Sequence, residues 1–183
     1  MCSSDLATPR RPRLARPHSG AQLVVGPTSV PLGNEVTECN YFKLQTKHDM
    51  AVNKIDIKVQ GGSHHVHLYR PNDPSTNLAD GSETCNYALD FEQWGLDLAS
   101  QGGRLRWQLP AGVAFHFAAG EQLAAQTHYV DTGLLTTDGA GWSIINLHSI
   151  ARRKVTSWAG SNARKRKLGL AGLSWSVPMR KGL

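Results

Sequence analysis

The chain has 183 residues, of which 40% are hydrophobic, and this length fits a single domain with its own core. No run approaches the roughly 20 consecutive apolar residues that a membrane-spanning helix needs, so composition argues against a membrane partner. The net charge of +6 is uneven: residues 21–150 carry seven Lys and Arg against thirteen Asp and Glu, whereas residues 1–20 and 151–183 carry net charges of +3 and +9.

Residues 1–20 are rich in Pro and Arg and nearly lack large apolar side chains, which predicts a disordered segment. They contain no apolar stretch of the kind found in a secretory signal. Residues 1–6 resemble the translation of a common sequencing adapter. We therefore expect an artefactual start from which an export signal has been lost; the alternative is an ordinary flexible basic arm.

The central part, residues 21–150, begins with strand-like segments. Residues 22–25 are a short candidate strand, followed by turn residues at Pro27, Pro31 and positions 33–34. Residues 36–44 form a second candidate. Residues 53–59 alternate cleanly between apolar and polar side chains, as a half-buried strand does.

Further along, the pattern continues as short segments separated by turns. Residues 70–84 are predicted to form a long loop, and residues 86–100 show only weak helical periodicity. Residues 104–109 alternate like an edge strand, and residues 113–117 and 122–130 are predicted to form an antiparallel pair. Residues 142–148 are another strand, after which residues 151–183 lose the alternation and form a basic tail. The pattern predicts an all-β protein, a sandwich or a jelly roll.

Three of the eight histidines, His64, His65 and His67, fall within four residues, next to the glycine break at Gly61-Gly62. Imidazole is a good ligand for Cu, Zn, Fe and Ni. On a regular strand His65 and His67 share one face and His64 the other, which favours His65 with His67 as a ligand pair. A bulge next to the glycines would instead let the adjacent pair His64 and His65 converge. His128, in the middle of another strand, is a natural third ligand. The remaining histidines are interpreted as structural: His18, His48, His116 and His148.

Other histidine motifs fail on particular residues. A metallo-hydrolase motif needs an acid where Tyr69 stands, and a cupin needs a glutamate where residues 70–72 are Arg-Pro-Asn. A blue-copper site needs a cysteine ligand with a histidine close behind it, which Cys85 lacks. The paired cysteines of a zinc finger are absent. The chain has three cysteines, Cys2, Cys39 and Cys85, and their spacing alone does not establish a disulfide.

Three stretches together resemble the N-terminal domain of the copper type II, ascorbate-dependent monooxygenases, the family of peptidylglycine α-hydroxylating and dopamine β-monooxygenases. They are His64-His65 before an apolar strand, Leu-Pro-Ala-Gly-Val-Ala-Phe at residues 109–115, and Gln-Thr-His-Tyr-Val-Asp at residues 126–131. The resemblance covers about residues 28–150. Each stretch is weak alone, and the combination is fairly specific.

This resemblance implies an antiparallel β-sandwich of jelly-roll type and an oxidoreductase function. His64, His65 and His128 would bind the electron-transfer copper, and Cys39 and Cys85 would form a disulfide. The electron donor would be ascorbate or another one-electron reductant, and the compartment would be periplasmic or extracellular. His67 departs from the apolar residue that the family carries there, and its role stays open.

The family's enzymes have a second domain, in which another copper held by His-x-His and Met activates oxygen. After residue 150 the chain has no His-x-His, and Met179 is the only late methionine. We therefore expect a truncated gene in which residues 155–160 lead toward that missing domain. The main alternative is a stand-alone copper-binding or buffering module. A nucleic-acid partner for the basic ends is disfavoured, because the central part is acidic. The hydroxylated substrate and the oligomeric state are not predicted.

Overall fold

The structure, a computed structural model, describes residues 13–60, 63–85, 91–131 and 139–159. Within these ranges no helix is long and apolar enough to cross a membrane. The described elements are strands and one 3-10 turn, as follows: β1 (Gly20–Val30), β2 (Glu35–Lys43), β3 (Met50–Val59), β4 (Ser63–Pro71), β5 (Gly81–Thr84), β6 (Trp94–Gln101), β7 (Arg104–Gln108), β8 (Val113–Phe117), β9 (Gln122–Val130), β10 (Gly139–Ile150), η1 (Arg152–Lys154) and β11 (Ser157–Ala159).

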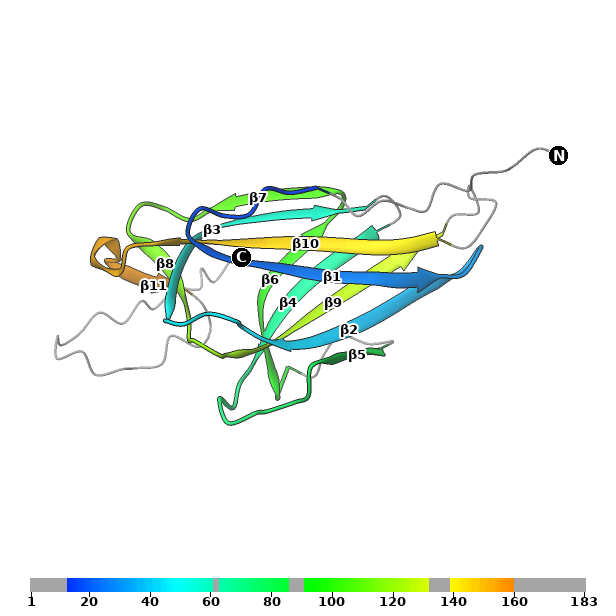
Figure 1. Cartoon of the computed structure of the whole chain (residues 1–183), viewed down its shortest axis with the longest axis horizontal. Helices are drawn as coiled ribbons and strands as arrows, with labels where there is room; N and C mark the ends of the chain where they lie inside the picture. Colours follow the sequence, from blue (N-terminus) through cyan, green and yellow to red (C-terminus); the bar gives the residue numbers. More distant parts are fainter. Residues whose placement is uncertain (1–12, 61–62, 86–90, 132–138, 160–183) are drawn as a thin grey trace, which may run out of the picture.

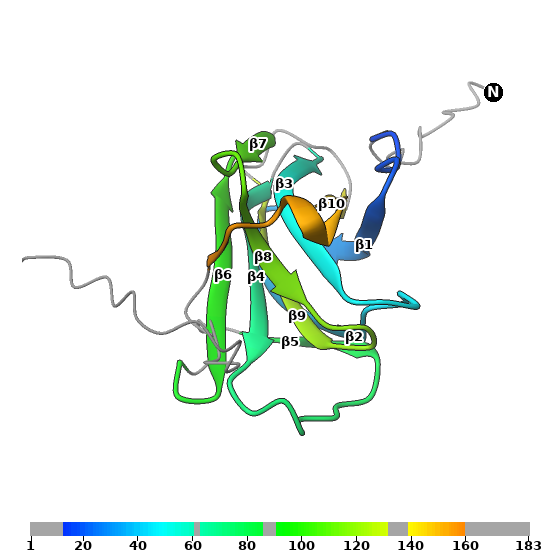
Figure 2. The same cartoon turned by 90° about the vertical axis from the view of Figure 1, so that its left-hand side faces the viewer.

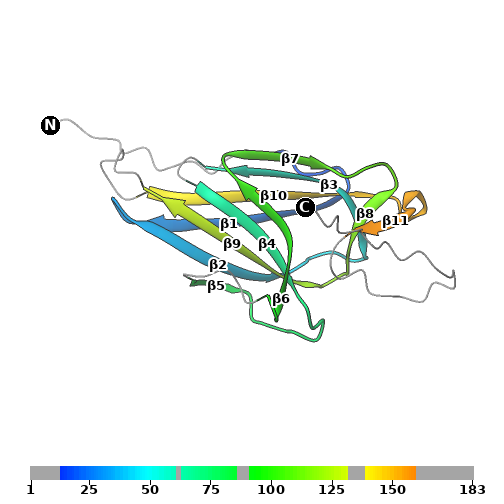
Figure 3. The same ribbon diagram turned by 180° about the vertical axis from the view of Figure 1, so that it is seen from behind.

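The strands form two sheets that pack face to face (Figure 1). The first has the order β1-β10-β3-β8-β11, with β7 also paired to β3; the second has the order β5-β2-β9-β4-β6. Figure 3 shows the second sheet from its own side, with β9 and β4 adjacent. The ladders are antiparallel except for β11 against β8. The predicted all-β sandwich is confirmed, whereas its jelly-roll character stays a prediction.

The core lies between the sheets and follows the predicted alternation. On β3, Ile55, Ile57 and Val59 point inward while Lys54 and Lys58 lie on the outer face. Burying such side chains contributes roughly 1.5–3 kcal/mol each. The second sheet supplies the opposing apolar side chains of the same cluster, among them Val66, Leu68, Leu98, Leu123 and Ala125.

The predicted pairing of residues 113–117 with 122–130 is wrong. β8 pairs with β3 in the first sheet, whereas β9 lies between β2 and β4 in the second (Figure 2). The turn between them therefore connects two sheets. Glu121 stabilises this crossover, since its carboxylate accepts the backbone N–H of Ala118 at 2.8 Å.

Three other segments differ from the sequence expectation. The predicted loop 70–84 ends in β5, which pairs with β2, and residues 94–101 form β6 although their pattern showed weak helical periodicity. β1 continues through Pro27 at a register shift between Val25 and Thr28, because a proline is tolerated in an edge strand at a bulge. Residues 86–90 lie outside the described part.

The packed region begins before residue 21. The backbone carbonyls of Arg13, Leu14 and Ala15 accept hydrogen bonds from Lys58, Gln22 and Asn146, all on the outer face of the first sheet. Composition gave no sign of this contact, since Lys58 and Asn146 lie on strands far away in the sequence. At the other end, β11 extends the first sheet beyond residue 150, so part of the predicted basic tail pairs with β8. The predictions for residues 1–12 and 160–183 fall outside the described part.

Two buried carboxylates are held by basic side chains. Arg70 donates to Asp97 at 2.6 Å and stacks over the Phe117 ring; burial raises the pKa of Asp97, and Arg70 opposes that rise. Burial would also raise the pKa of Asp56, but the hydrogen bond from Lys54 and the contact with His148 hold it below its ordinary value.

Candidate metal centre

A β-bulge brings the adjacent histidines onto one face. Ser63 of β4 pairs with Tyr129 of β9, and His65 pairs with His128, so two residues of β4 face one residue of β9. His64 is the extra residue. A regular strand would have pointed it to the opposite face; the bulge turns it toward His65 and His128 instead. The structure thus has the distortion that the preceding glycines favour.

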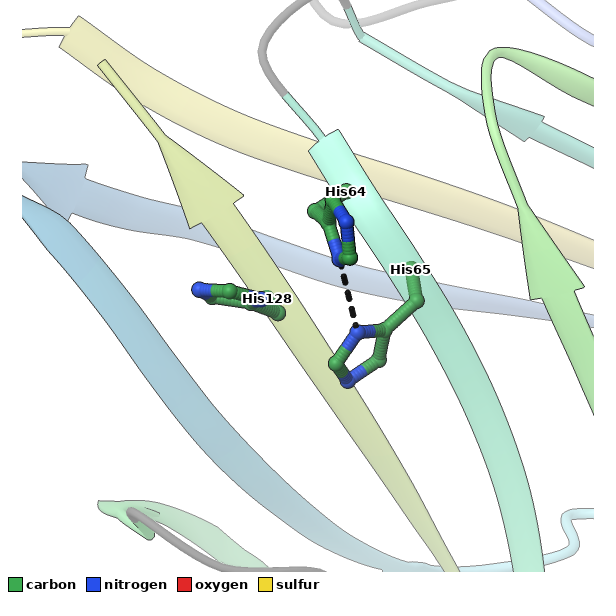
Figure 4. Close-up of side chains that lie close together, drawn as sticks. All are labelled: His64, His65 and His128. Atoms are coloured by element: carbon green, nitrogen blue, oxygen red, sulfur yellow. Dashed lines mark hydrogen bonds between the residues drawn. The ribbon is translucent and has the colours of Figure 1, made fainter. Parts of the chain in front are cut away.

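The three rings gather where β4 begins and β9 ends (Figure 4). The Nδ1 atoms of His64 and His65 lie 3.3 Å apart, and one nitrogen from each of His64, His65 and His128 lies within 4.8 Å of the others. Metal–nitrogen bonds of about 2.0–2.1 Å require ligand nitrogens to be roughly 3.3–4.1 Å apart. Small side-chain rotations would close the difference, so these residues fit a metal ion.

Glu35, at the start of β2, fixes the orientation of His128. Its carboxylate lies 3.0 Å from Nε2 of His128. Because a carboxylate accepts hydrogen bonds, Nε2 of His128 carries the hydrogen and Nδ1 keeps its lone pair for a metal. A carboxylate behind a histidine is the usual arrangement around metal ligands, and it also raises the basicity of the ligand.

His65 is partly buried, whereas His64 is exposed. Burial lowers the pKa of His65 to about 4, with further lowering from His67, His128 and His64, while Gln126 partly offsets these effects. A neutral imidazole is the metal-binding form, so His65 is ready to bind at neutral pH. Its Nε2 is shielded from solvent.

His67 lies on the same face but is held by other groups. Its ring stacks on His65, with centroids 4.3 Å apart and planes 18° apart. Its Nδ1 lies 3.2 Å from the hydroxyl of Tyr69 and 3.3 Å from Oε1 of Gln126. The face sharing of His65 and His67 was therefore predicted correctly, while His67 stands beside the three-histidine cluster. The sequence analysis included Gln126 in the resembling stretch 126–131 without giving it a role, and it missed Glu35, for which no local signal exists.

The disulfide between Cys39 and Cys85 confirms the pairing that the resemblance implied, while Cys2 lies outside the described residues. It joins β2 to the end of β5. The amide nitrogen of Gln126 lies 3.7 Å from the sulfur of Cys85 and 3.9 Å from that of Cys39. The disulfide is therefore in contact with Gln126, a polar neighbour of the histidine cluster.

Tyr129 follows His128 but points to the opposite face of β9. Its hydroxyl is 2.9 Å from Ser143 Oγ of β10, and burial raises its pKa to about 12. The ring packs directly on Gly141, where a Cβ would lie 2.6 Å from it. This contact attaches the end of β9, and with it His128, to the first sheet.

The other histidines lie elsewhere. His116 is bound to Asp49 at 3.0 Å and His148 to Asp56 at 2.9 Å, both on the first sheet, while His18 and His48 are exposed. Among the described residues, His64, His65 and His128 are the one group of three His, Cys, Asp or Glu side chains with metal-ligand spacing.

Fold and site together define a disulfide-bonded β-sandwich protein with a candidate three-histidine metal centre. No protein-family model matches the chain, and no curated protein sequence matches it. These two comparisons therefore assign no family to the chain.

Proposed function

We propose that this chain is a redox-active copper-binding domain that relays electrons as the N-terminal domain of the copper type II, ascorbate-dependent monooxygenases does. The observation that carries the proposal is the bulge at His64, which gathers two adjacent histidines and His128 from the neighbouring strand. The resembling stretches of sequence supply the link to that family.

The donor set favours copper among the common metals. Three imidazoles without a thiolate or carboxylate ligand suit several transition metals, and divalent copper binds such ligands most tightly in the first-row series. Bound copper would supply one-electron chemistry, taking an electron from a donor such as ascorbate and passing it to a second centre. The chain's own contribution is to hold His65 neutral through burial and to orient His128 through the carboxylate of Glu35.

A copper titration tests the ligand assignment. Wild-type protein is expected to bind one copper, with an electron paramagnetic resonance spectrum of nitrogen ligation. His128→Ala removes one ligand and is expected to weaken binding by more than the roughly 10–100-fold typical of changes behind the ligands. His116→Ala, which alters a histidine on the other sheet, is the matched control. Unchanged stoichiometry and spectrum in His128→Ala would refute the assignment.

Electron relay is separated from copper buffering by kinetics. Ascorbate is expected to abolish the electron paramagnetic resonance signal of the copper-loaded protein rapidly. A mild one-electron oxidant should restore this signal without loss of metal. Release of the metal on each reduction would instead support a stand-alone buffering module. These measurements need no knowledge of the hydroxylated substrate.

A further inference from the structure

His67 is the residue of the cluster that the copper assignment leaves without a role. It follows His65 by two positions on β4, opposite Gln126 of β9. Its ring lies nearly parallel to that of His65, with a centroid distance of 4.3 Å. This is a stacking contact between two half-buried rings, with no shared ion needed to explain it.

The position of His67 is set by groups that are themselves fixed. The amide oxygen of Gln126 only accepts hydrogen bonds, so Nδ1 of His67, 3.3 Å away, donates to it. Gln126 and Tyr69 are almost fully buried, with exposed fractions of 2% and 1%. The amide nitrogen of Gln126 faces the sulfurs of the Cys39–Cys85 disulfide. The His67 ring is therefore anchored to a covalently closed part of the sheet.

His65 is supported by different groups from those that support His128. A metal-binding histidine is normally oriented by a hydrogen bond at its second ring nitrogen. Glu35 supplies this bond to His128, whereas the His65 side chain has Gln126 as its hydrogen-bonding neighbour. The stacked His67 ring lies nearly parallel to the His65 ring and so restricts rotation of its plane.

We propose that His67 is a positioning residue of the metal centre, which fixes the His65 ring by stacking and is itself anchored through Gln126 to the Cys39–Cys85 disulfide. The inference rests on the proposed copper function. It explains why a histidine occurs at this position: the residue must offer a flat ring to His65 and a donor to Gln126, and an aliphatic side chain offers neither.

The test compares variants that separate ring from hydrogen bond. His67→Leu and His67→Gln lack the ring and are expected to weaken copper binding about 10–100-fold and to change the copper spectrum. His67→Phe keeps a stacking ring but loses the donor to Gln126, so its copper affinity is expected to fall between those of wild type and His67→Leu. His148→Leu, at a partly buried histidine of the first sheet, is the matched control. Binding and spectra like wild type in the Leu and Gln variants, or loss in Phe as large as in Leu, would overturn the proposal.

A metal-free measurement keeps this test separate from the copper assignment. In the metal-free protein, nuclear magnetic resonance relaxation of the His65 ring should show a rigid side chain, which becomes more mobile in His67→Leu and His67→Gln than in His67→Phe. If wild type binds no copper, the proposed function fails while this measurement still decides the stacking role. A His65 ring equally mobile in all variants would refute that role directly.

Discussion

Loss of the Cys39–Cys85 disulfide is expected to remove a large part of the stability of the domain. The bond closes a loop across a sequence separation of 46 residues, and the loop-entropy model gives about 4 kcal/mol for a loop of this length. Domains of this kind are stable by only about 5–15 kcal/mol in total. Reduction should therefore leave the protein folded in the absence of urea but move its unfolding midpoint to a low urea concentration.

The assay is urea unfolding of metal-free protein followed by tryptophan fluorescence. Wild type with the bond intact is compared with reduced wild type, and with a Cys39→Ala, Cys85→Ala variant that cannot form it. Cys2→Ala is the matched control and should unfold like the oxidised wild type. Cys39 is fully buried, so the alanine variant should lose slightly more than the reduced protein. A loss below about 1 kcal/mol, with the bond verified by mass spectrometry, would contradict the loop-entropy estimate.

Three other changes test the packing and charge of the sandwich. Arg70→Met removes the guanidinium that pairs with the buried Asp97 carboxylate, and it should lower the free energy of unfolding in urea by about 3–5 kcal/mol. Adding Asp97→Leu to the same chain should restore most of this loss. The lowered pKa of Asp56 means that its stabilisation is complete above its ordinary pKa of about 4 and is lost as the pH falls through the lower folded value. In Asp56→Asn the free energy of unfolding should therefore fall less steeply than in wild type as the pH is lowered into the acid range. Gly141→Ala places a methyl group against the Tyr129 ring and should cost about 1–3 kcal/mol, whereas the same change in a Tyr129→Leu background should cost little.

The sequence was informative wherever the signal is local. The alternation of residues 53–59 predicted β3 and its inward face, because side chains on a strand alternate whatever the partner strand is. Residues 36–44 and 142–148 likewise correspond to β2 and β10 with ends shifted by a few residues. Where both faces of a strand are buried, as on β8 and β9, alternation is lost. The sequence then could not tell which sheet each strand joins.

For the candidate site, the sequence determined which side chains are available: a cluster of histidines on one strand, another histidine in a distant strand, and two cysteines in the central part. It left two face assignments open for His64, because strand periodicity and a bulge predict opposite answers. Only the register of β4 against β9 decided between them, by placing His64 as the extra residue opposite His128. Glu35 reaches His128 across 93 positions, and Gln126 meets His67 across 59. Such contacts depend on which strands pair and in which register, and pairing is set by the burial of the whole sheet rather than by any local stretch.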